Sequence, residues 1–227
     1  MSWRSFVTWV IIHLVLFSSL GAYGAFYYLG RVHKDRDLLL KENTERLMGY
    51  IRREQRIEDM TDVLVRSYDL DSIRAYYYSF FFDEMSRKYG FDWEWYAALM
   101  RMESNFNPSA KSKSRPPAKG LMQIKEKTIK DMCDSLHISY RPDTTVWDDV
   151  ASILCGAHYF SMHARKKGAE YGARVYVGGR DYLRTIKYSR EDRQYVKEYK
   201  SSVVREFRRL SMAYDGVRAS KNRPKIR

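Results

Sequence analysis

One glutamate lies at a position where a carboxyl can transfer protons. Glu103 ends an apolar, helix-forming segment, and a polar loop beginning with Ser104 follows it. A carboxyl at such a junction is partly wrapped by apolar groups and still open to a ligand, which suits a general acid and base. After the loop comes Gly120–Gln123 (Gly-Leu-Met-Gln), where glycine permits close backbone approach and the glutamine amide offers a donor and an acceptor. Separately, each segment is more typical of a solvated helix end or of core packing.

A run of amphipathic helices is predicted to position these two segments. The expected helices cover residues 74–89, 93–103, 125–136 and 150–157, and a last long helix begins near residue 189. Gly90 is a stop signal for the first helix, and Asp92 is a good N-cap for the second. Ser189 and Asp192 have capping-box spacing. The last helix then carries one apolar stripe, formed by Val196, Tyr199, Val203, Phe207 and Leu210. No convincing alternating strand is found, so the pattern predicts an all-α domain.

Several motifs occur in the order found in the soluble lytic transglycosylase (SLT) family, which this chain therefore resembles. Two motifs carry most of the likeness, Glu-Ser-x-Phe-x-Pro starting at Glu103 and the Gly-Leu-Met-Gln segment. The supporting elements are Tyr89–Asp92, Thr128, Gly156 with Tyr159, Val175–Gly179 (similar to Ala-Tyr-Asn-Ala-Gly) and Glu191–Val196 (similar to Glu-Thr-Arg-x-Tyr-Val). The match covers roughly residues 83–200. This resemblance implies a lysozyme-like catalytic domain.

The resemblance also implies roles for individual residues. Glu103 is the implied catalytic acid and base. The implied substrate-contacting residues are Ser112, Met122, Gln123, Tyr176, Glu191 and Tyr195. Among them, Gln123 and Tyr176 are expected to bind the glycan and orient Glu103, and Glu191 to meet the peptide stem. No cofactor is implied.

Three departures from the family pattern bear on how the substrate is held. The loop between Ser112 and Gly120 is slightly longer than usual, and Pro117 stands where glycine is typical. Val177 replaces the Asn of the Tyr-Asn element, and Lys125-Glu126 replaces Met-Pro. We expect these changes to leave the catalytic roles intact and to alter subsite preference.

The implied mechanism needs a single carboxyl. Glu103 protonates the glycosidic oxygen between MurNAc and GlcNAc, then accepts the proton of the MurNAc C6 hydroxyl as that oxygen closes on C1, which leaves a 1,6-anhydro end. To act near neutral pH, Glu103 must have a pKa about 2 units above that of a free Glu, which corresponds to roughly 3 kcal/mol of desolvation. The residues expected to supply the apolar wall are Met102, Phe106, Met122 and Tyr176.

Two alternative functions remain open at this point. A lysozyme-type hydrolase on the same fold needs a second carboxylate at roughly 5 to 10 Å from the first. No acid lies between Asn105 and Lys125, although Glu126 or Asp131 can fold nearby. The departures at Val177 and Lys125 suggest the other alternative, a membrane-tethered glycan-binding scaffold that has lost turnover.

Other kinds of site are disfavoured. The five histidines (His13, His33, His137, His158 and His163) lack zinc-type spacing with thiolates, so no metal is expected. The formal net charge of +13 attracts anions, but the basic residues are spread over helices without a nucleic-acid reading motif. The expected partners are peptidoglycan glycan strands and the membrane, which is reached through the N-terminal helix, and no specific nucleic acid.

The N-terminus is predicted to be a membrane anchor. Phe6 to Leu29 is a run of 24 residues without a charge, and as a helix it is about 36 Å long, enough to cross a bilayer. A cleaved signal peptide is the alternative, since Ala22–Gly24 offers small residues. The basic residues that follow, Arg31, Lys34 and Arg36, favour a cytoplasmic C-terminal side. Because large domains can be exported despite this bias, we expect a single-pass protein of the inner (cytoplasmic) membrane, with its catalytic domain facing the periplasm or cell wall.

The predicted organisation is an anchor over 1–30, a helical stalk over 31–72, the catalytic domain over 73–214 and a basic disordered tail over 215–227. A coiled-coil dimer of the stalk is an open alternative, although charged residues interrupt its heptads. Cys133 and Cys155, the only cysteines, fall on apolar helical stripes. They are expected to be buried thiols that can form a disulfide in an oxidising compartment.

Overall fold

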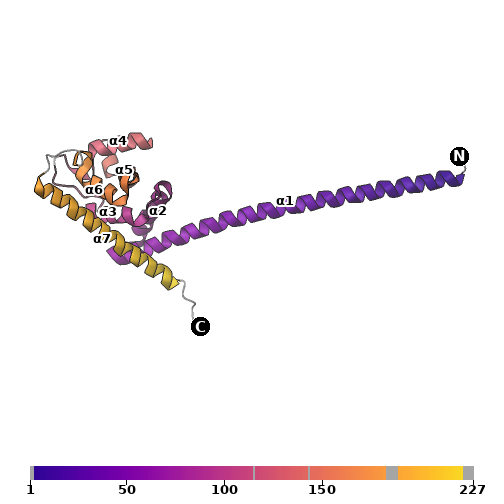
Figure 1. Cartoon of the computed structure of the whole chain (residues 1–227), viewed down its shortest axis with the longest axis horizontal. Coiled ribbons are helices and arrows are strands. Elements are labelled where there is room, and N and C mark those ends of the chain that lie inside the picture. Colours follow the sequence, from indigo (N-terminus) through magenta and orange to yellow (C-terminus); the bar gives the residue numbers. More distant parts are fainter. Residues whose placement is uncertain (1–2, 115, 143, 183–188, 222–227) are drawn as a thin grey trace. The chain divides into compact units, whose positions relative to one another are not determined.

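The computed structural model describes residues 3–114, 116–142, 144–182 and 189–221, with the backbone alone described for 3–17, 19–22, 25 and 179–182. Its elements, labelled in Figure 1, are mainly helical. They are α1 (Trp3–Tyr68), α2 (Ser72–Tyr89), α3 (Trp93–Ser104), β1 (Ala118–Lys119), β2 (Ile124–Lys125), α4 (Glu126–Leu136), the 3₁₀ helix η1 (Thr145–Trp147), α5 (Asp149–Lys167), α6 (Ala169–Tyr182) and α7 (Arg190–Lys221). The five helices predicted around the site are therefore all present.

Capping residues explain where α2 begins and ends. The Asp71 carboxylate accepts a hydrogen bond of 2.9 Å from the backbone N–H of Arg74 and so caps the first turn. Gly90 ends the helix in the left-handed conformation, with φ 77°, and its N–H donates to the Ser86 carbonyl. Gly90 is thus the predicted stop signal, and this prediction is confirmed.

The start of α7 is the predicted capping box. The Ser189 hydroxyl accepts a 3.0 Å hydrogen bond from the Asp192 backbone N–H, and the Asp192 carboxylate accepts one of 3.1 Å from the Ser189 backbone N–H. Most of the predicted apolar stripe is buried, namely Val196, Tyr199, Val203 and Leu210, and Phe207 is partly buried. This stripe lets α7 pack along α3 and α6.

The C-terminal part of α7 corrects one expectation. Residues 215–221, assigned above to a disordered tail, are helical. The reason is an anchoring ion pair, because the Lys221 Nζ lies 2.8 Å from the Asp59 carboxylate and 2.9 Å from that of Asp62. The remainder of the predicted tail, 222–227, lies outside the described residues.

Three features were not predicted. The first is the short antiparallel pair β1–β2, in which Ala118 faces Lys125 and Lys119 faces Ile124. The second is the 3₁₀ helix η1. The third is α6, whose glycine content conceals a helix. Gly172 allows α6 to lie close to α5, since a Cβ at this position would be 2.8 Å from the Ala164 Cβ.

Helix α3 lies at the centre of the core. Tyr96, Leu99 and Met100 are fully buried, and α3 packs against α2 and α7. Trp95 is stacked between two rings, with centroids 4.3 Å from Phe207 of α7 and 6.2 Å from Phe160 of α5. These aromatic contacts hold the first turn of α3 against α5 and α7.

The chain divides into two compact units, 1–55 and 56–227. The first is the N-terminal part of α1, whose described side chains are mostly exposed, including Leu40 and Leu47. The second includes the last turns of α1, where Ile57, Met60 and Leu64 are buried. The predicted stalk therefore ends earlier than residue 72, because these residues form an apolar face at i, i+3 and i+7. The coiled-coil dimer stays a prediction.

The predicted anchor falls largely on residues whose side chains are not described. The backbone of 6–29 is helical. Within the described part of the chain, no helix is both long enough and apolar enough to span a bilayer.

Candidate active site

Glu103 lies in the last turn of α3, at the junction predicted from the sequence. The chain turns sharply after it, because Asn105 and Phe106 both have positive φ, 54° and 60°. The Asn105 N–H donates to the Arg101 carbonyl and closes the helix. Phe106 is buried, and its ring centroid lies 4.6 Å from that of Tyr68. The buried ring fixes the turn and leaves Glu103 at the edge of the core.

The carboxyl of Glu103 is half-buried and bound by one tyrosine. The Tyr199 hydroxyl of α7 donates a short hydrogen bond to Glu103 Oε1. Burial raises the pKa of Glu103 from 4.5 to about 7, and the hydrogen bond from Tyr199 acts in the opposite direction. Near neutral pH the group is therefore present in comparable amounts as acid and as carboxylate, the condition for proton transfer in both directions.

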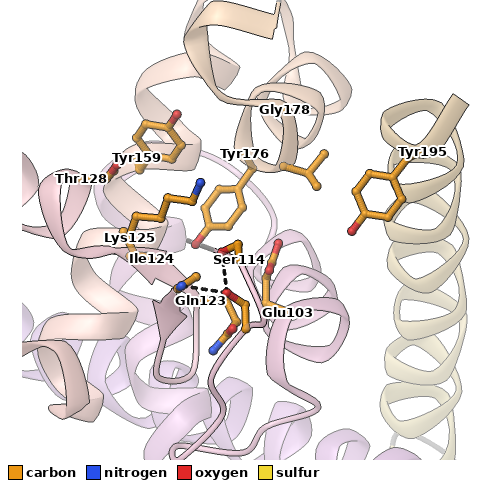
Figure 2. Close-up of a pocket in the computed structure, with 13 residues that line it drawn as sticks. Glu103, Ser114, Gln123, Ile124, Lys125, Thr128, Tyr159, Tyr176, Gly178 and Tyr195 are labelled. Carbon is orange, nitrogen blue, oxygen red and sulfur yellow. Dashed lines mark hydrogen bonds between the residues drawn. The ribbon is translucent and has the colours of Figure 1, made fainter. Parts of the chain in front are cut away.

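Glu103 opens onto a cavity of about 370 Å³, shown in Figure 2. The wall is assembled from the end of α3, the following loop, both strands, α4, α5, α6 and α7. The lining residues are Glu103, Ser112, Ser114, Ala118, Gln123, Ile124, Lys125, Thr128, Tyr159, Tyr176, Val177, Gly178 and Tyr195. We call this cavity the first hollow.

A second hollow of about 840 Å³ adjoins it on the α7 side. It shares Glu103, Ser112, Gln123 and Tyr195 with the first hollow. The other lining residues are Arg101, Met102, Ser104, Asn105, Ala110, Lys111, Glu198, Tyr199, Ser202 and Glu206. Because Glu103 borders both hollows, an extended ligand can reach past the carboxyl on either side.

The turn at Gly120, which leads into Gln123, is fixed by contacts with neighbouring segments. Gly120 has φ +75°, and a Cβ there would lie 2.8 Å from the Val146 carbonyl oxygen, so glycine is required both for its conformation and for space. The Met122 backbone N–H donates to the Ser152 hydroxyl at 3.1 Å. These contacts tie the turn to α5 and to the segment before it.

Gln123 lines both hollows with a restricted hydrogen-bonding capacity. Its backbone is left-handed, with φ 45°. Its amide nitrogen donates to the Ala110 carbonyl at 2.8 Å and to the Gly120 carbonyl at 2.9 Å. Both amide hydrogens are therefore used within the protein, and Gln123 can offer a ligand only its oxygen, an acceptor. The sequence-based expectation of a donor and an acceptor is corrected in this respect.

Tyr176 and Met122 do not have the expected orientations. Tyr176 lines the first hollow, but its hydroxyl donates to the Met122 carbonyl at 2.7 Å, whereas the tyrosine that donates to Glu103 is Tyr199. The Met122 side chain is fully buried and lines neither hollow. It packs on Gly156 of α5, where a Cβ would lie 2.7 Å from the Met122 Cβ.

The predicted apolar wall is also different. Phe106 belongs to the core with 1% exposure, and Met102 is 39% exposed at the second hollow. The rings nearest the carboxyl are those of Tyr176 and Tyr199, which line the first and second hollow respectively. Tyr199 appeared in the sequence only as a member of an apolar stripe. Its i, i+4 spacing from Tyr195 was the available signal that two tyrosines share one face of α7.

The remaining predicted site residues divide into two groups. Ser112, Gln123, Tyr176 and Tyr195 all line the first hollow, as do Thr128 and Tyr159 from the supporting motifs. The Ser112 hydroxyl lies 2.8 Å from that of Ser114, which sequence reasoning missed, and accepts from the Ala118 N–H at 2.8 Å (Figure 2). Glu191 is exposed and lines neither hollow, because the capping turn of α7 holds it at the helix start.

The acids that line the hollows besides Glu103 come from α7, which was not expected from the sequence. Glu126 and Asp131 line neither hollow, and the Glu126 carboxylate accepts a hydrogen bond from Tyr140. The second hollow is instead lined by Glu198 and Glu206 of α7. Burial alone would raise the pKa of Glu206, but hydrogen bonds from Arg209 and Tyr68 hold it below its ordinary value.

The two cysteines and His158 are engaged in contacts within the protein. Cys133 and Cys155 are buried free thiols with their Sγ atoms 3.6 Å apart, and burial raises the pKa of both. His158 lies between the hydroxyls of Tyr89 and Ser135, each at 3.0 Å. In the described part of the chain, no group of three or more His, Cys, Asp or Glu side chains could hold a metal ion.

Comparison with known proteins identifies one matching family. The model of the transglycosylase SLT domain matches residues 80–196. Two similar solved structures are an inactive mutant of the lytic transglycosylase Slt from Pseudomonas aeruginosa (22% identity, TM-score 0.46) and the 70 kDa soluble lytic transglycosylase from Escherichia coli (23% identity, TM-score 0.48). The alignments cover 57% and 58% of this chain and 24% of each of those chains. The chain thus matches about a quarter of their length.

Proposed function

The chain belongs to the transglycosylase SLT family, and on this premise we propose that it is a lytic transglycosylase that cuts peptidoglycan at the β-1,4 bond between MurNAc and GlcNAc. The proposed product carries a 1,6-anhydro-MurNAc end. The observation that carries the proposal is Glu103, a half-buried carboxyl with a pKa of about 7 that borders both hollows.

The proposed reaction uses Glu103 first as an acid and then as a base. The protonated carboxyl donates to the glycosidic oxygen, the bond from this oxygen to C1 of MurNAc breaks, and GlcNAc leaves with a free 4-hydroxyl. The resulting carboxylate accepts the proton of the MurNAc C6 hydroxyl while O6 bonds to C1. Glu103 ends in its starting protonation state, and no water is consumed.

The two hollows supply contacts on either side of the reacting bond. Gln123 can accept a hydrogen bond from a sugar hydroxyl or amide N–H, and the exposed ring of Tyr195 offers an apolar face to a sugar. Lys125 in the first hollow and Lys111 in the second add positive charge. This charge favours a polymer that bears carboxylates, as peptidoglycan does.

Mass spectrometry of digested sacculi tests the substrate, the reaction and the residue together. The wild-type chain is expected to release muropeptides with 1,6-anhydro ends, and Glu103→Gln is expected to lower their yield by about 10³-fold, because the amide is too weak an acid to transfer a proton to the glycosidic oxygen. Reducing ends in place of anhydro ends would contradict the proposal. Binding of sacculi by the wild type without any product would indicate a glycan-binding scaffold.

A lysozyme-type hydrolase is the second candidate, and one observation favours it. Glu198 lines the same hollow as Glu103, so a second carboxylate is available to activate water. Under this alternative, Glu198→Gln abolishes activity and the wild-type products have reducing ends. Under the transglycosylase mechanism, Glu198→Gln leaves the anhydro end unchanged in the products.

The location is also a proposal. We propose that residues 6–29 hold the chain in the cytoplasmic membrane and that the catalytic unit faces the periplasm or cell wall, because the segment is uncharged and the substrate lies outside the membrane. Protease added to spheroplasts should digest residues 56–227 and leave a membrane-bound N-terminal fragment. Full protection of the catalytic unit until the membrane is lysed would contradict this orientation.

A further inference from the structure

The contact between Tyr199 and Glu103 is built into the packing of α7. Tyr199 is 8% exposed, and its neighbours on the same face, Val196 and Val203, are also buried. Helix α7 packs directly on α3, the helix that carries Glu103. The hydroxyl that meets the carboxyl is therefore supplied by a packed helix, which holds a side chain more firmly than a loop does.

The other tyrosines around the carboxyl are committed elsewhere or open to solvent. The Tyr176 hydroxyl donates to the Met122 carbonyl, and the Tyr195 ring is 61% exposed. Tyr159 packs edge-on against Tyr176, with centroids 5.6 Å apart. Among the described residues, the hydrogen bond assigned to the Glu103 carboxyl is that from Tyr199.

We infer that Tyr199 is a positioning residue, which binds Oε1 of Glu103 so that Oε2 is the oxygen that exchanges protons with the sugar. This inference rests on the proposed function. A carboxyl that accepts a hydrogen bond at Oε1 carries its acidic proton on Oε2 and presents that atom to the ligand. When the proton leaves, the same hydrogen bond stabilises the new carboxylate.

Tyr199 keeps its own proton throughout this cycle. Burial, and then the negative charge of Glu103, raise the pKa of the Tyr199 hydroxyl well above its ordinary value. The hydroxyl therefore donates a hydrogen bond in both protonation states of Glu103. The proton that reaches the glycosidic oxygen comes from Glu103 alone, and the same carboxyl is reprotonated by the C6 hydroxyl.

The charged groups around the two hollows set the background for this effect. The cations are Arg101 of α3, Lys111 of the loop and Lys125 of β2, and the acids are Glu198 and Glu206 of α7. The causes that shift the pKa of Glu103 are nevertheless burial, which raises it, and the Tyr199 hydrogen bond, which lowers it. Removing the hydroxyl should thus leave burial unopposed and make Glu103 a weaker acid.

The test compares Tyr199→Phe with the wild type in the full-length chain, using steady-state rates on solubilised peptidoglycan between pH 5 and 9. Because the protonated form of Glu103 starts the reaction, activity falls as pH rises through its pKa. Tyr199→Phe is expected to move this alkaline limb upward by about one pH unit and to lower kcat about 10-fold with little change in KM. An unmoved alkaline limb would overturn the inference and leave Tyr199 with a packing role.

Tyr68→Phe is the matched control. The Tyr68 hydroxyl also donates to a carboxylate of α7, that of Glu206, but it does not touch Glu103. This variant is expected to lose some thermal stability, as Tyr199→Phe does, and to keep the wild-type pH limb. If both variants shift the limb equally, the shift comes from general loosening of α7 and the inference fails.

A second substitution changes the acidity of the hydroxyl at position 199 without removing the hydroxyl. Incorporating 3-fluorotyrosine at position 199 keeps the ring and the hydroxyl but makes the hydroxyl a stronger donor, so the alkaline limb should move to lower pH. A limb that stays in place, or moves upward, would contradict the inference. Glu103→Gln distinguishes failure of the proposed function from failure of the Tyr199 inference. If Glu103→Gln is active, the proposed function is wrong. If Glu103→Gln is inactive but the alkaline limb does not move in the Tyr199 variants, only the role of Tyr199 is wrong.

Discussion

The two ends of α3 carry two carboxyls with the same shift and different surroundings. Glu94 lies in the first turn with 6% exposure, and burial, followed by the charges of Asp92 and Asp215, raises its pKa to about 7 against an opposing hydrogen bond of its own backbone. Burial raises the pKa of Glu103, in the last turn, to about 7 as well. Helix α7 reaches both carboxyls: the Tyr199 hydroxyl donates to Glu103, and the Ser211 hydroxyl, which lowers the pKa of Glu94, donates its proton to the Phe207 carbonyl.

The difference between the two carboxyls is access. Glu103 borders both hollows, and Glu94 lines neither of them. A perturbed pKa is therefore a by-product of burial at one end of the helix and a usable property at the other. What distinguishes the catalytic candidate is the space in front of it, where a substrate oxygen can approach within hydrogen-bonding distance.

The largest expected difference between Glu103 and Glu94 is the effect of their substitution on catalytic activity. Glu103→Gln is expected to lose about 10³-fold of the anhydro-muropeptide yield, while Glu94→Gln should stay within about 2-fold of the wild type, because it changes a buried group away from the hollows. Mass spectrometry of digested sacculi measures both. Equal losses in the two variants would show that access does not distinguish the carboxyls.

Glu94 and Glu103 should have the same effect on the stability of the fold. A carboxyl whose pKa is raised in the folded state stabilises the fold fully below its unfolded pKa near 4.5, and this contribution is lost as pH rises through 7. Replacing either Glu by Gln should therefore raise the free energy of unfolding at pH 8 by about 3 kcal/mol and have little effect at pH 4. The two gains should add, since nine residues of helix separate the groups by about 13 Å.

Denaturant titrations of the two single variants and the double variant at pH 4 and pH 8 provide the measurement. A gain for Glu103→Gln alone would mean that Glu94 is better solvated than its burial implies. A larger gain at pH 4 than at pH 8 would reverse the sign and contradict the raised pKa values.

The smallest expected effect concerns Asp92, the N-cap of α3. Its charge is one of the causes that raise the pKa of Glu94. The Asp92 side chain makes no capping hydrogen bond, so Asp92→Asn removes the charge without removing a cap, and the pKa of Glu94 should fall by a few tenths of a unit, typical of an exposed charge in water. Carbon-13 NMR titration of the side-chain carboxyls measures this fall. The pH limb of the enzymatic rate should stay in place, and a parallel shift would show that the two ends are electrostatically coupled.

Local signals predicted most of the helices because the responsible contacts are local. Gly90 ends α2 through its own backbone conformation, and Ser189 with Asp192 caps α7 within one turn. Helix α6 escaped prediction because Gly172 serves close packing against α5, a partner that periodicity cannot identify. The end of α7 was misjudged for a similar reason, since Lys221 pairs with residues of α1.

In the candidate site, too, residues with a local sequence signal were predicted, and residues whose role depends on distant contacts were not. Glu103 and Gln123 were found from short motifs, and the structure places both beside the hollows. Met122 was assigned to the wall because the motif could not reveal that Gly156 receives its side chain. Tyr199 was missed because its partner lies 96 residues away in the sequence, and a tyrosine in an apolar stripe reads as core until the fold brings a carboxyl to its hydroxyl.

Under the proposed function, the commitment of both Gln123 amide hydrogens also sets which edge of an N-acetyl group faces this residue. A neighbour that presents only lone pairs repels an acetyl carbonyl and attracts the amide N–H on the opposite edge of the group. This polarity is set before any sugar arrives, by the hydrogen bonds of the Gln123 amide to the backbone carbonyls of Ala110 and Gly120.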